Sequence, residues 1–300
     1  MTEPVLADTL QHAPAAVADT VHAAAGAEHA AGGFDFNHLL QHIRDSRELE
    51  LPFGHLEFPH FPPIHVGGIS IDLSITKHVF FLFVAAILLT VAAVYTSRRM
   101  RSNPVPRGFA NVMEVFVIFI RDEVVLPTMG PAGLRYVPFI LTTFLYILIM
   151  NLLGLVPYGA SATGNISVTA GLAFVAFIMI QVAAIRAQGF THYLAHFTGG
   201  GAWWLWPIMV PIEILGIFTK PFALCMRLFA NMSGGHVVIL ALIGFVFLAR
   251  SIFFAPIPVI FVVGINLLEI LVAFIQAYVF AMLTALFMGL GMPVEHEEHG

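Results

Sequence analysis

The side chains of this sequence that could do chemistry lie in two long apolar stretches near its C-terminal end. The first stretch, 203–254, carries a line of polar residues spaced by seven, seven and four: Glu213, Lys220, Arg227 and Asn231. The second stretch, 257–290, carries Glu269 and Gln276, again seven apart. Positions seven apart in a helix drift by only about 20°, so each stretch presents one polar line on one face. Two such lines predict a buried polar path between two helices.

These residue types fit proton transfer. A charge at mid-membrane costs about 2.5–3.5 kcal/mol on insertion scales, so such residues pair, face water or have a function. His236 and Glu269 can both take up and release protons, and with Asn231 and Gln276 they could line a water-filled proton path. Arg227 stays protonated and cannot relay a proton. As a fixed positive charge it lowers the pKa of any carboxylate brought near it.

Two of these residues also have plainer structural interpretations. Arg227 could be a structural cation neutralised by Glu269 or Glu213. His236 could be a packing residue between helices, beside two glycines.

The overall composition excludes a soluble fold. Apolar residues make up 59% of the 300 positions and charged residues only 10%, against about 25% charged in soluble proteins. The basic residues of the hydrophobic part are too sparse for a nucleic-acid surface. The single cysteine excludes an intramolecular disulfide and a multi-cysteine metal site.

Apolar segments near the roughly 20 residues that span a bilayer predict an all-α polytopic membrane protein with about five membrane helices. They are expected at about 75–97, 137–156, 166–186, 203–254 and 257–290. The fourth, as one helix of about 1.5 Å rise per residue, would be roughly 78 Å long. It is therefore either two helices or one strongly tilted helix, and a long tilted hairpin with the fifth is favoured. Prolines are expected to bend these two segments.

The segment 109–126 carries four charges, which predicts an amphipathic helix at the interface instead of a span. Pro127, Gly130, Pro131 and Gly133 are expected to end it.

The remaining segments are predicted to lie outside the membrane domain, 71–292. Residues 1–70 form an extramembrane segment, partly disordered, with a short amphipathic helix at 34–50 and extended chain at 51–68. His38 and His42 have a spacing that can hold a metal ion, but a solvated surface is the better interpretation. Residues 293–300 are a polar tail.

Charge asymmetry predicts the orientation. Four arginines between positions 98 and 107 mark a cytoplasmic loop. The N-terminus is then outside, and five crossings leave the C-terminus in the cytoplasm.

The stretch KPFALCMRLFANMSGGH at 220–236 contains the motif K-P-x-x-L-x-x-R-L-F-x-N-M. With LLEILVAFIQAYVFAMLTALFM at 267–288 and PFILTTFLYILIMNLLGLVPY at 138–158, it closely resembles subunit a of F-type ATP synthases. The resemblance covers about residues 70–290 and implies a multi-pass protein of the bacterial inner membrane.

The resemblance implies a role for each polar residue. Arg227 corresponds to the family's stator charge, and Gln276 to its last-helix glutamine. Where the family commonly has Glu nine residues after the arginine and His in the last helix, this chain has His236 and Glu269, as in the mitochondrial version. Glu213 resembles the acidic residue of the other half-channel, and Asn231 belongs to the motif.

The implied partners are the c-ring proteolipids, the peripheral-stalk subunit b, the rest of the ATP synthase and the lipid bilayer. The implied mechanism moves protons through two offset half-channels to carboxylates of the c-ring. No cofactor or metal is expected, and the chain by itself is not expected to be an enzyme, because it lacks a P-loop motif.

Two rival functions predict features that the sequence lacks. A secondary transporter would show internal repeats with broken helices in corresponding halves. An intramembrane metalloprotease needs H-E-x-x-H on a helix, and the nearest match is the tail HEEH at 296–299.

Overall fold

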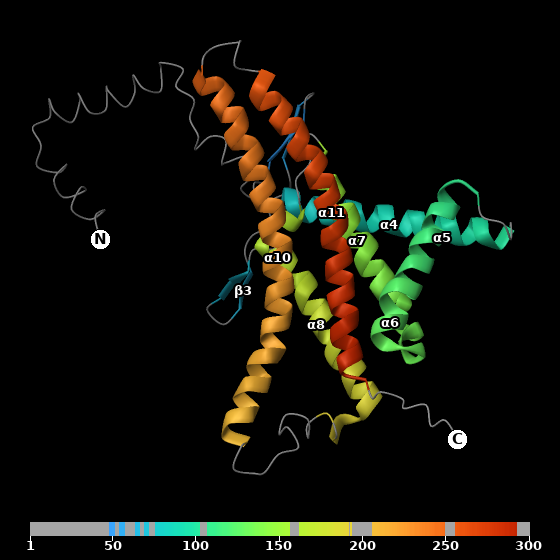
Figure 1. Ribbon diagram of the computed structural model, residues 1–300. Coiled ribbons are helices and arrows are strands. Elements are labelled where there is room, and N and C mark those ends of the chain that lie inside the picture. The colour runs from blue at the N-terminus through green and yellow to red at the C-terminus, as the bar shows by residue number, and fades with distance from the viewer. Residues whose placement is uncertain are drawn as a thin grey trace, which may run out of the picture.

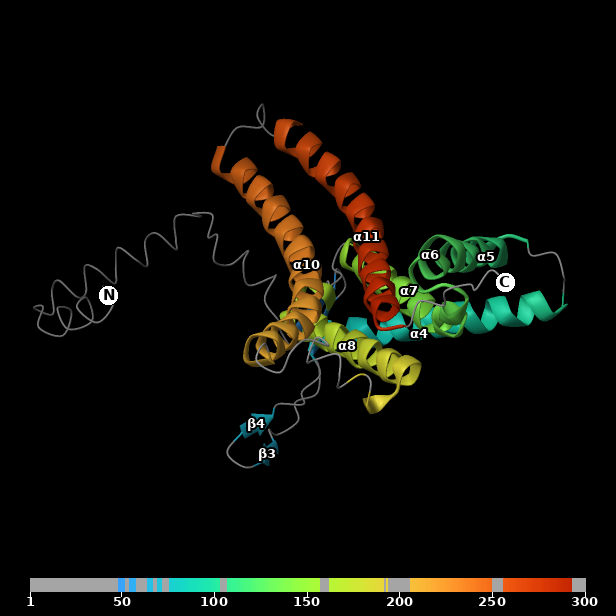
Figure 2. The ribbon, with the colours of Figure 1, turned by 60° about the horizontal axis from the view of Figure 1, so that its bottom comes forward.

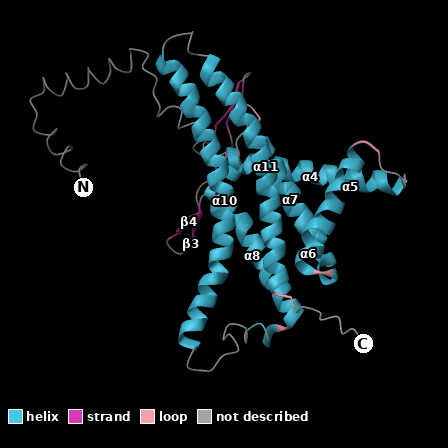
Figure 3. Cartoon of the chain, viewed as in Figure 1, coloured by secondary structure: helices cyan, strands magenta, loops and turns pink. Residues whose placement is uncertain are grey.

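A computed structural model describes residues 48–51, 54–57, 64–66, 69–71, 76–102, 107–156, 162–191, 193, 206–249 and 256–292. The predicted helix at 34–50 falls mostly outside these residues, and so do the histidine pair 38/42 and the tail 293–300. Nearly all of the described chain is helical (Figure 3), which confirms the predicted fold class.

Two small antiparallel hairpins precede the helices. Strand β1 (Glu48–Leu51) pairs with β2 (Gly54–Glu57), and β3 (Ile64–Val66) pairs with β4 (Ile69–Ile71). These strands agree with the extended chain predicted around 51–68, but they begin inside the segment predicted as a short helix.

Five helices are long and apolar enough to cross a membrane. They include α4 (Lys77–Ser102), α7 (Val137–Gly154) with the preceding 3-10 helix η2 (Pro131–Tyr136), α8 (Ile166–Gln188), α10 (Trp206–Ala249) and α11 (Pro256–Leu290). A second short 3-10 helix, η3 (Ala162–Gly164), precedes α8, whose first turn is capped by the Asn165 side chain accepting from the Ser167 amide at 2.9 Å.

The charged segment before η2 differs from the prediction at its end. Helix α5 (Phe109–Phe119) continues into a π-helix, η1 (Ile120–Val125), and then into α6 (Leu126–Met129). Pro127 does not end the helix, because it lies in the first turn of α6, where a backbone N–H would have no partner within that helix. The chain turns at Gly130, with φ of 63°. Arg121 donates to both oxygens of Asp122 at 2.6 and 3.0 Å, and this hydrogen bonding lowers the pKa of Asp122.

The last two helices are single and long. Helix α10 has 44 residues and α11 has 35, which at 1.5 Å per residue are about 66 and about 52 Å. Pro211 and Pro221 lie inside α10 without ending it, as is common for membrane helices whose neighbours satisfy the freed carbonyls. Figures 1 and 2 show α10 and α11 side by side and running steeply across the direction of α4. A helix longer than the bilayer core of about 30 Å can keep its apolar residues inside the core by tilting. The lengths of α10 and α11 are therefore consistent with the predicted tilt.

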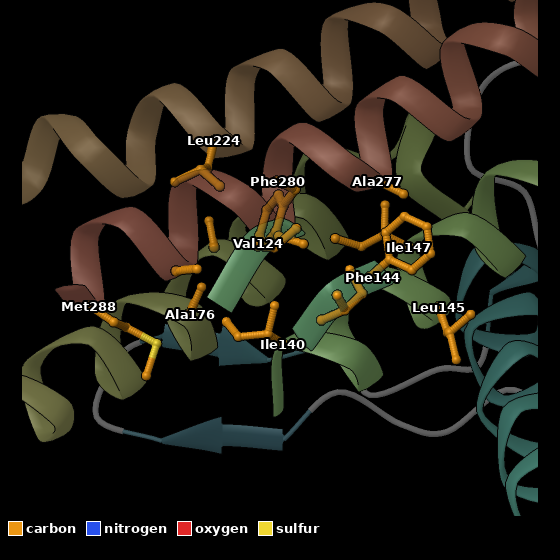
Figure 4. Close-up of a cluster of buried hydrophobic side chains, with 14 of the residues drawn as sticks. Val124, Ile140, Phe144, Leu145, Ile147, Ala176, Leu224, Ala277, Phe280 and Met288 are labelled. Atoms are coloured by element: carbon orange, nitrogen blue, oxygen red, sulfur yellow. The ribbon is translucent and has the colours of Figure 1, made fainter. Parts of the chain in front are cut away.

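The core lies where α7, α8 and α11 meet η1 and α10. A line of fully buried alanines lets α11 approach its neighbours closely: Ala273, Ala277, Ala281 and Ala285. Larger side chains from the other elements fill the space around this line, among them Val124, Ile140, Phe144 and Leu224 (Figure 4).

The close approach of α11 to α6 generates a prediction. A Cβ at Gly289 would overlap the backbone carbonyl of Thr128, which cannot move aside as a flexible side chain could. Gly289→Ala should therefore destabilise the protein by about 1–3 kcal/mol, a typical cost of overpacking, and lower the thermal unfolding midpoint in detergent.

Gly264→Ala is the matched control on the same helix. A Cβ at Gly264 meets nothing within 4 Å, and alanine favours the helix by about 0.5–1 kcal/mol. An unfolding midpoint for Gly289→Ala equal to or above that of Gly264→Ala would contradict the packing seen here.

Candidate functional site: the seam between the two long helices

The two predicted polar lines lie on α10 and α11, which pack against each other along a seam. Three contacts, in antiparallel order, set the register of this seam: Lys220 with Phe287, Asn231 with Gln276, and Gly235 with Glu269. The Lys220 ammonium lies 5.2 Å from the centre of the Phe287 ring, a cation–π distance. The structure thus brings Asn231 and Gln276 together between the two helices, whereas Arg227 and Asn231 are exposed, and the buried polar path stays a prediction.

A hydrogen bond joins the two lines at the middle of the seam. The amide nitrogen of Asn231 donates to the side-chain oxygen of Gln276 at 2.6 Å. Gln276 is only 3% exposed, and its amide nitrogen has no hydrogen-bond partner in the described part of the chain. A buried hydrogen-bond donor without a partner destabilises the folded chain. The amide nitrogen of Gln276 is therefore available to a water molecule or to a group from outside the chain.

The carboxylate of Glu269 lies directly against the backbone of Gly235. A Cβ at position 235 would overlap the Oε1 atom of Glu269, so glycine makes the space that this carboxylate occupies. Glu269 is 7% exposed, and neither of its oxygens has a hydrogen-bond partner among the described residues. The seam thus holds a buried acid with its hydrogen-bonding capacity unused.

His236 follows Gly235 in α10, so its backbone lies at the same level of the seam as Glu269. The side chain of His236 lies outside the described part of the structure. The predicted pairing of His236 with Glu269 stays a prediction.

Arg227 lies one helical turn from Asn231, on the exposed part of α10. It forms no hydrogen bond or ion pair with any residue that the structure describes, and this includes Glu269 and Glu213. The interpretation of Arg227 as a structural cation neutralised by one of these acids therefore does not hold in this structure. Its guanidinium is free to meet an acid from outside the chain.

Glu213 lies near the start of α10, far from Glu269. Glu213 and Gly235 are 22 positions apart, which is about 33 Å along a helix. Close to Glu213 is Tyr193, whose hydroxyl donates to the side-chain oxygen of Gln181 at 2.5 Å. Burial raises the pKa of Tyr193, and the negative charge of Glu213 raises it further.

Sequence reasoning missed a second group of polar contacts behind the seam. Asn151, fully buried in α7, accepts from the Thr163 hydroxyl at 2.8 Å and donates to the carbonyl of Ala273 at 3.4 Å. The Ser233 hydroxyl donates to the carbonyl of Gly164 at 3.3 Å. These bonds tie η3 to α7 and α10, and they tie α7 to α11 one helical turn from Glu269. The available signal was Asn151 itself, the one amide side chain in an otherwise apolar predicted span.

Comparison with known proteins agrees with this arrangement. Residues 78–289 match the family model described as ATP synthase A chain. A protein of Chloroherpeton thalassium named ATP synthase subunit a is 49% identical over 265 residues, which are 87% of this chain and 78% of that one. A protein of Myxococcus xanthus with the same name is 53% identical over 234 residues, 77% of each chain. The matched region contains all five long helices and the whole polar seam, and the chain belongs to the ATP synthase A chain family.

Proposed function

We propose that this chain is the proton-conducting stator subunit of the membrane sector of a rotary ATP synthase. In this proposal Arg227 is a fixed charge between two offset half-channels. The names of its relatives support a place in the ATP synthase. The observation that carries the finer proposal is that Arg227 is exposed and unpaired among described residues. Along α10 it lies between Glu213 and Gly235, where the Glu269 carboxylate of α11 meets the helix.

The spacing along α10 supports two separate paths. Arg227 is 14 residues from Glu213 and eight from Gly235, which are about 21 and about 12 Å along the helix. A proton entering at Glu269, with Asn231 and Gln276 beside it, reaches the level of Arg227 without passing Glu213. Glu213 then belongs to the exit path, and the permanent cation between the two sites repels protons that would cross directly.

The chemistry proposed for Arg227 is control of a partner's carboxylate. The partner is a ring of c-type proteolipids, each with one carboxylate in the membrane. A carboxylate of the ring that is protonated at the inlet is neutral and can move through lipid. An ionised carboxylate could not do so without a large free-energy cost. When the protonated carboxylate approaches Arg227, the positive charge favours its ionised form, and the proton leaves through the exit path. Each proton that crosses releases about 2.3 kcal/mol per 100 mV.

The exposed surface of α10 and α11 supports a helical partner in the membrane. Large apolar side chains of both helices are exposed, among them Leu215, Phe222, Leu267 and Leu271. A peripheral-stalk subunit b is the second proposed partner, through the other membrane helices.

We further propose that the N-terminus is outside the inner membrane and the C-terminus is in the cytoplasm. The arginines at the end of α4 support this orientation, because short basic loops stay on the cytoplasmic side.

The orientation predicts the accessibility of engineered thiols. With Cys225 replaced by alanine, a cysteine at Ser102 should resist an impermeant thiol reagent added to intact spheroplasts. A cysteine at Ser161, in the uncharged loop before α8, should react. The reverse pattern of labelling would overturn the proposed orientation.

Arg227→Ala should reduce gradient-driven ATP synthesis to less than about one per cent of wild type while the complex still assembles. Two opposite charges 4 Å apart attract each other by about 4 kcal/mol at an effective dielectric of 20. The alanine variant loses this attraction between Arg227 and the partner's carboxylate. Arg227→Lys should also fail or nearly fail, because a desolvated lysine loses its proton. The measurement is ATP synthesis in vesicles that contain the purified complex.

Arg186→Ala is the control for Arg227→Ala, because it removes an exposed positive charge from the end of α8. It should leave synthesis near wild type. Synthesis near the normal rate in assembled Arg227→Ala would refute the role given to Arg227.

The contact between Gly235 and Glu269 allows a test by compensation. Gly235→Ala should slow gradient-driven synthesis about tenfold, because its methyl group displaces the Glu269 carboxylate at an overpacking cost of about 1–3 kcal/mol. Adding Glu269→Asp, which withdraws the carboxylate by one methylene, should restore part of the rate.

Gly234→Ala provides the matched control, since a Cβ at Gly234 meets nothing within 4 Å. It should have little effect on the rate. If the double variant is no faster than Gly235→Ala alone, the two positions do not act through this contact.

A further inference from the structure

A cavity of about 510 Å³ lies against the end of α4, away from the α10–α11 seam. The described residues that line it share one face of the helix, in the order Thr90, Val91, Val94, Tyr95, Arg98 and Arg99. Its size falls in the range of small-molecule sites, about 300–1,000 Å³.

The lining changes from apolar to cationic along the helix. At the N-terminal end of this face the exposed Thr90 hydroxyl donates to the carbonyl of Ala86 at 2.8 Å, so its donor is used within α4. Val91 and Val94 follow and are exposed. At the C-terminal end of this face stand two consecutive arginines, Arg98 and Arg99.

Tyr95 lies at the boundary between the two parts. Its ring is 6.3 Å from the ring of Phe109, the first residue of α5, so α5 begins beside the cavity. An aromatic ring between apolar and charged surface is typical of the membrane–water interface, where Tyr and Trp are enriched.

The charge of Arg98 has no partner in the described chain: no hydrogen bond or ion pair there involves it. Guanidinium groups bind phosphate oxygens in a two-pronged geometry that suits phosphodiesters. An apolar strip that ends in paired arginines at the end of a membrane helix matches one chemical class, a molecule with an anionic phosphate and hydrocarbon chains.

We propose that this face of α4 is a binding site for an anionic phospholipid. Its phosphate lies on Arg98 and Arg99, its glycerol region lies beside Tyr95, and an acyl chain runs over Val94 and Val91. The site does not depend on the proton path proposed for Arg227, since it shares no residue with the seam.

The test uses the purified complete complex in vesicles of phosphatidylcholine that contain rising fractions of a photoactivatable phosphatidylglycerol. Cross-linked peptides are identified by mass spectrometry. Wild type should show saturable labelling within residues 90–99 that unlabelled phosphatidylglycerol removes and phosphatidylcholine does not.

Arg98→Gln/Arg99→Gln should raise the half-saturating fraction of phosphatidylglycerol about tenfold or more, because each basic residue near an anionic headgroup contributes roughly a fivefold gain in binding. Arg101→Gln is the matched control: it removes one charge from the same helix end but does not line the cavity. It should shift half-saturation by about fivefold at most, the contribution of one nearby charge, and by less than the double variant does.

Two results would overturn the proposal. Equal labelling by photoactivatable phosphatidylcholine, unchanged in the double variant, would mean that lipid contacts α4 without selectivity. A cysteine at Val94 that cross-links to another subunit, with no lipid labelling of 90–99, would mean that a protein covers this face. Amounts of assembled complex, measured for every variant, separate loss of binding from failure to fold.

Discussion

The arrangement of polar groups depends on the register between α10 and α11. Three contacts define that register, and each pairs a residue of one polar line with a residue of the other helix. A shift of α11 by one helical turn, about 5.4 Å, would separate Asn231 from Gln276 and move Glu269 away from the one glycine that makes space for it. The buried alanine line that holds α11 against its neighbours therefore also fixes the position of the acid.

The position of Arg227 follows from the same geometry. Leu224 and Leu228, on either side of it along α10, are buried, while Arg227 itself lies at the exposed edge. The helix thus anchors one face in the core and presents the cation on the other. A cation held by a continuous helix cannot move far from the seam, and this suits a group that acts by its charge alone.

The sequence predicted which faces are polar, because seven-residue spacing determines where side chains lie around a helix. It could not predict which residues meet, because the pairing of Glu269 with Gly235 depends on how far one helix is displaced along the other. Pro127, Gly130, Pro131 and Gly133 were expected to end the charged segment. The helix continues through Pro127 and ends at Gly130, because the tolerance of proline depends on where the next helical segment begins. The Asn151 contacts were missed for a related reason: their partners lie in η3 and α11, and no local pattern connects these segments.

Arg227 is exposed and has no partner among the described residues, and this has a consequence for the chain before assembly. An unassembled copy in the bilayer would present this cation to lipid, at a cost of about 2.5–3.5 kcal/mol on insertion scales. Folded proteins are stable by only about 5–15 kcal/mol, so this cost is a substantial fraction of the total. A partner carboxylate at Arg227 would remove the cost, which links the stability of the chain to its incorporation into the complex. Free copies would then be the less stable population and the preferred substrates of membrane proteases.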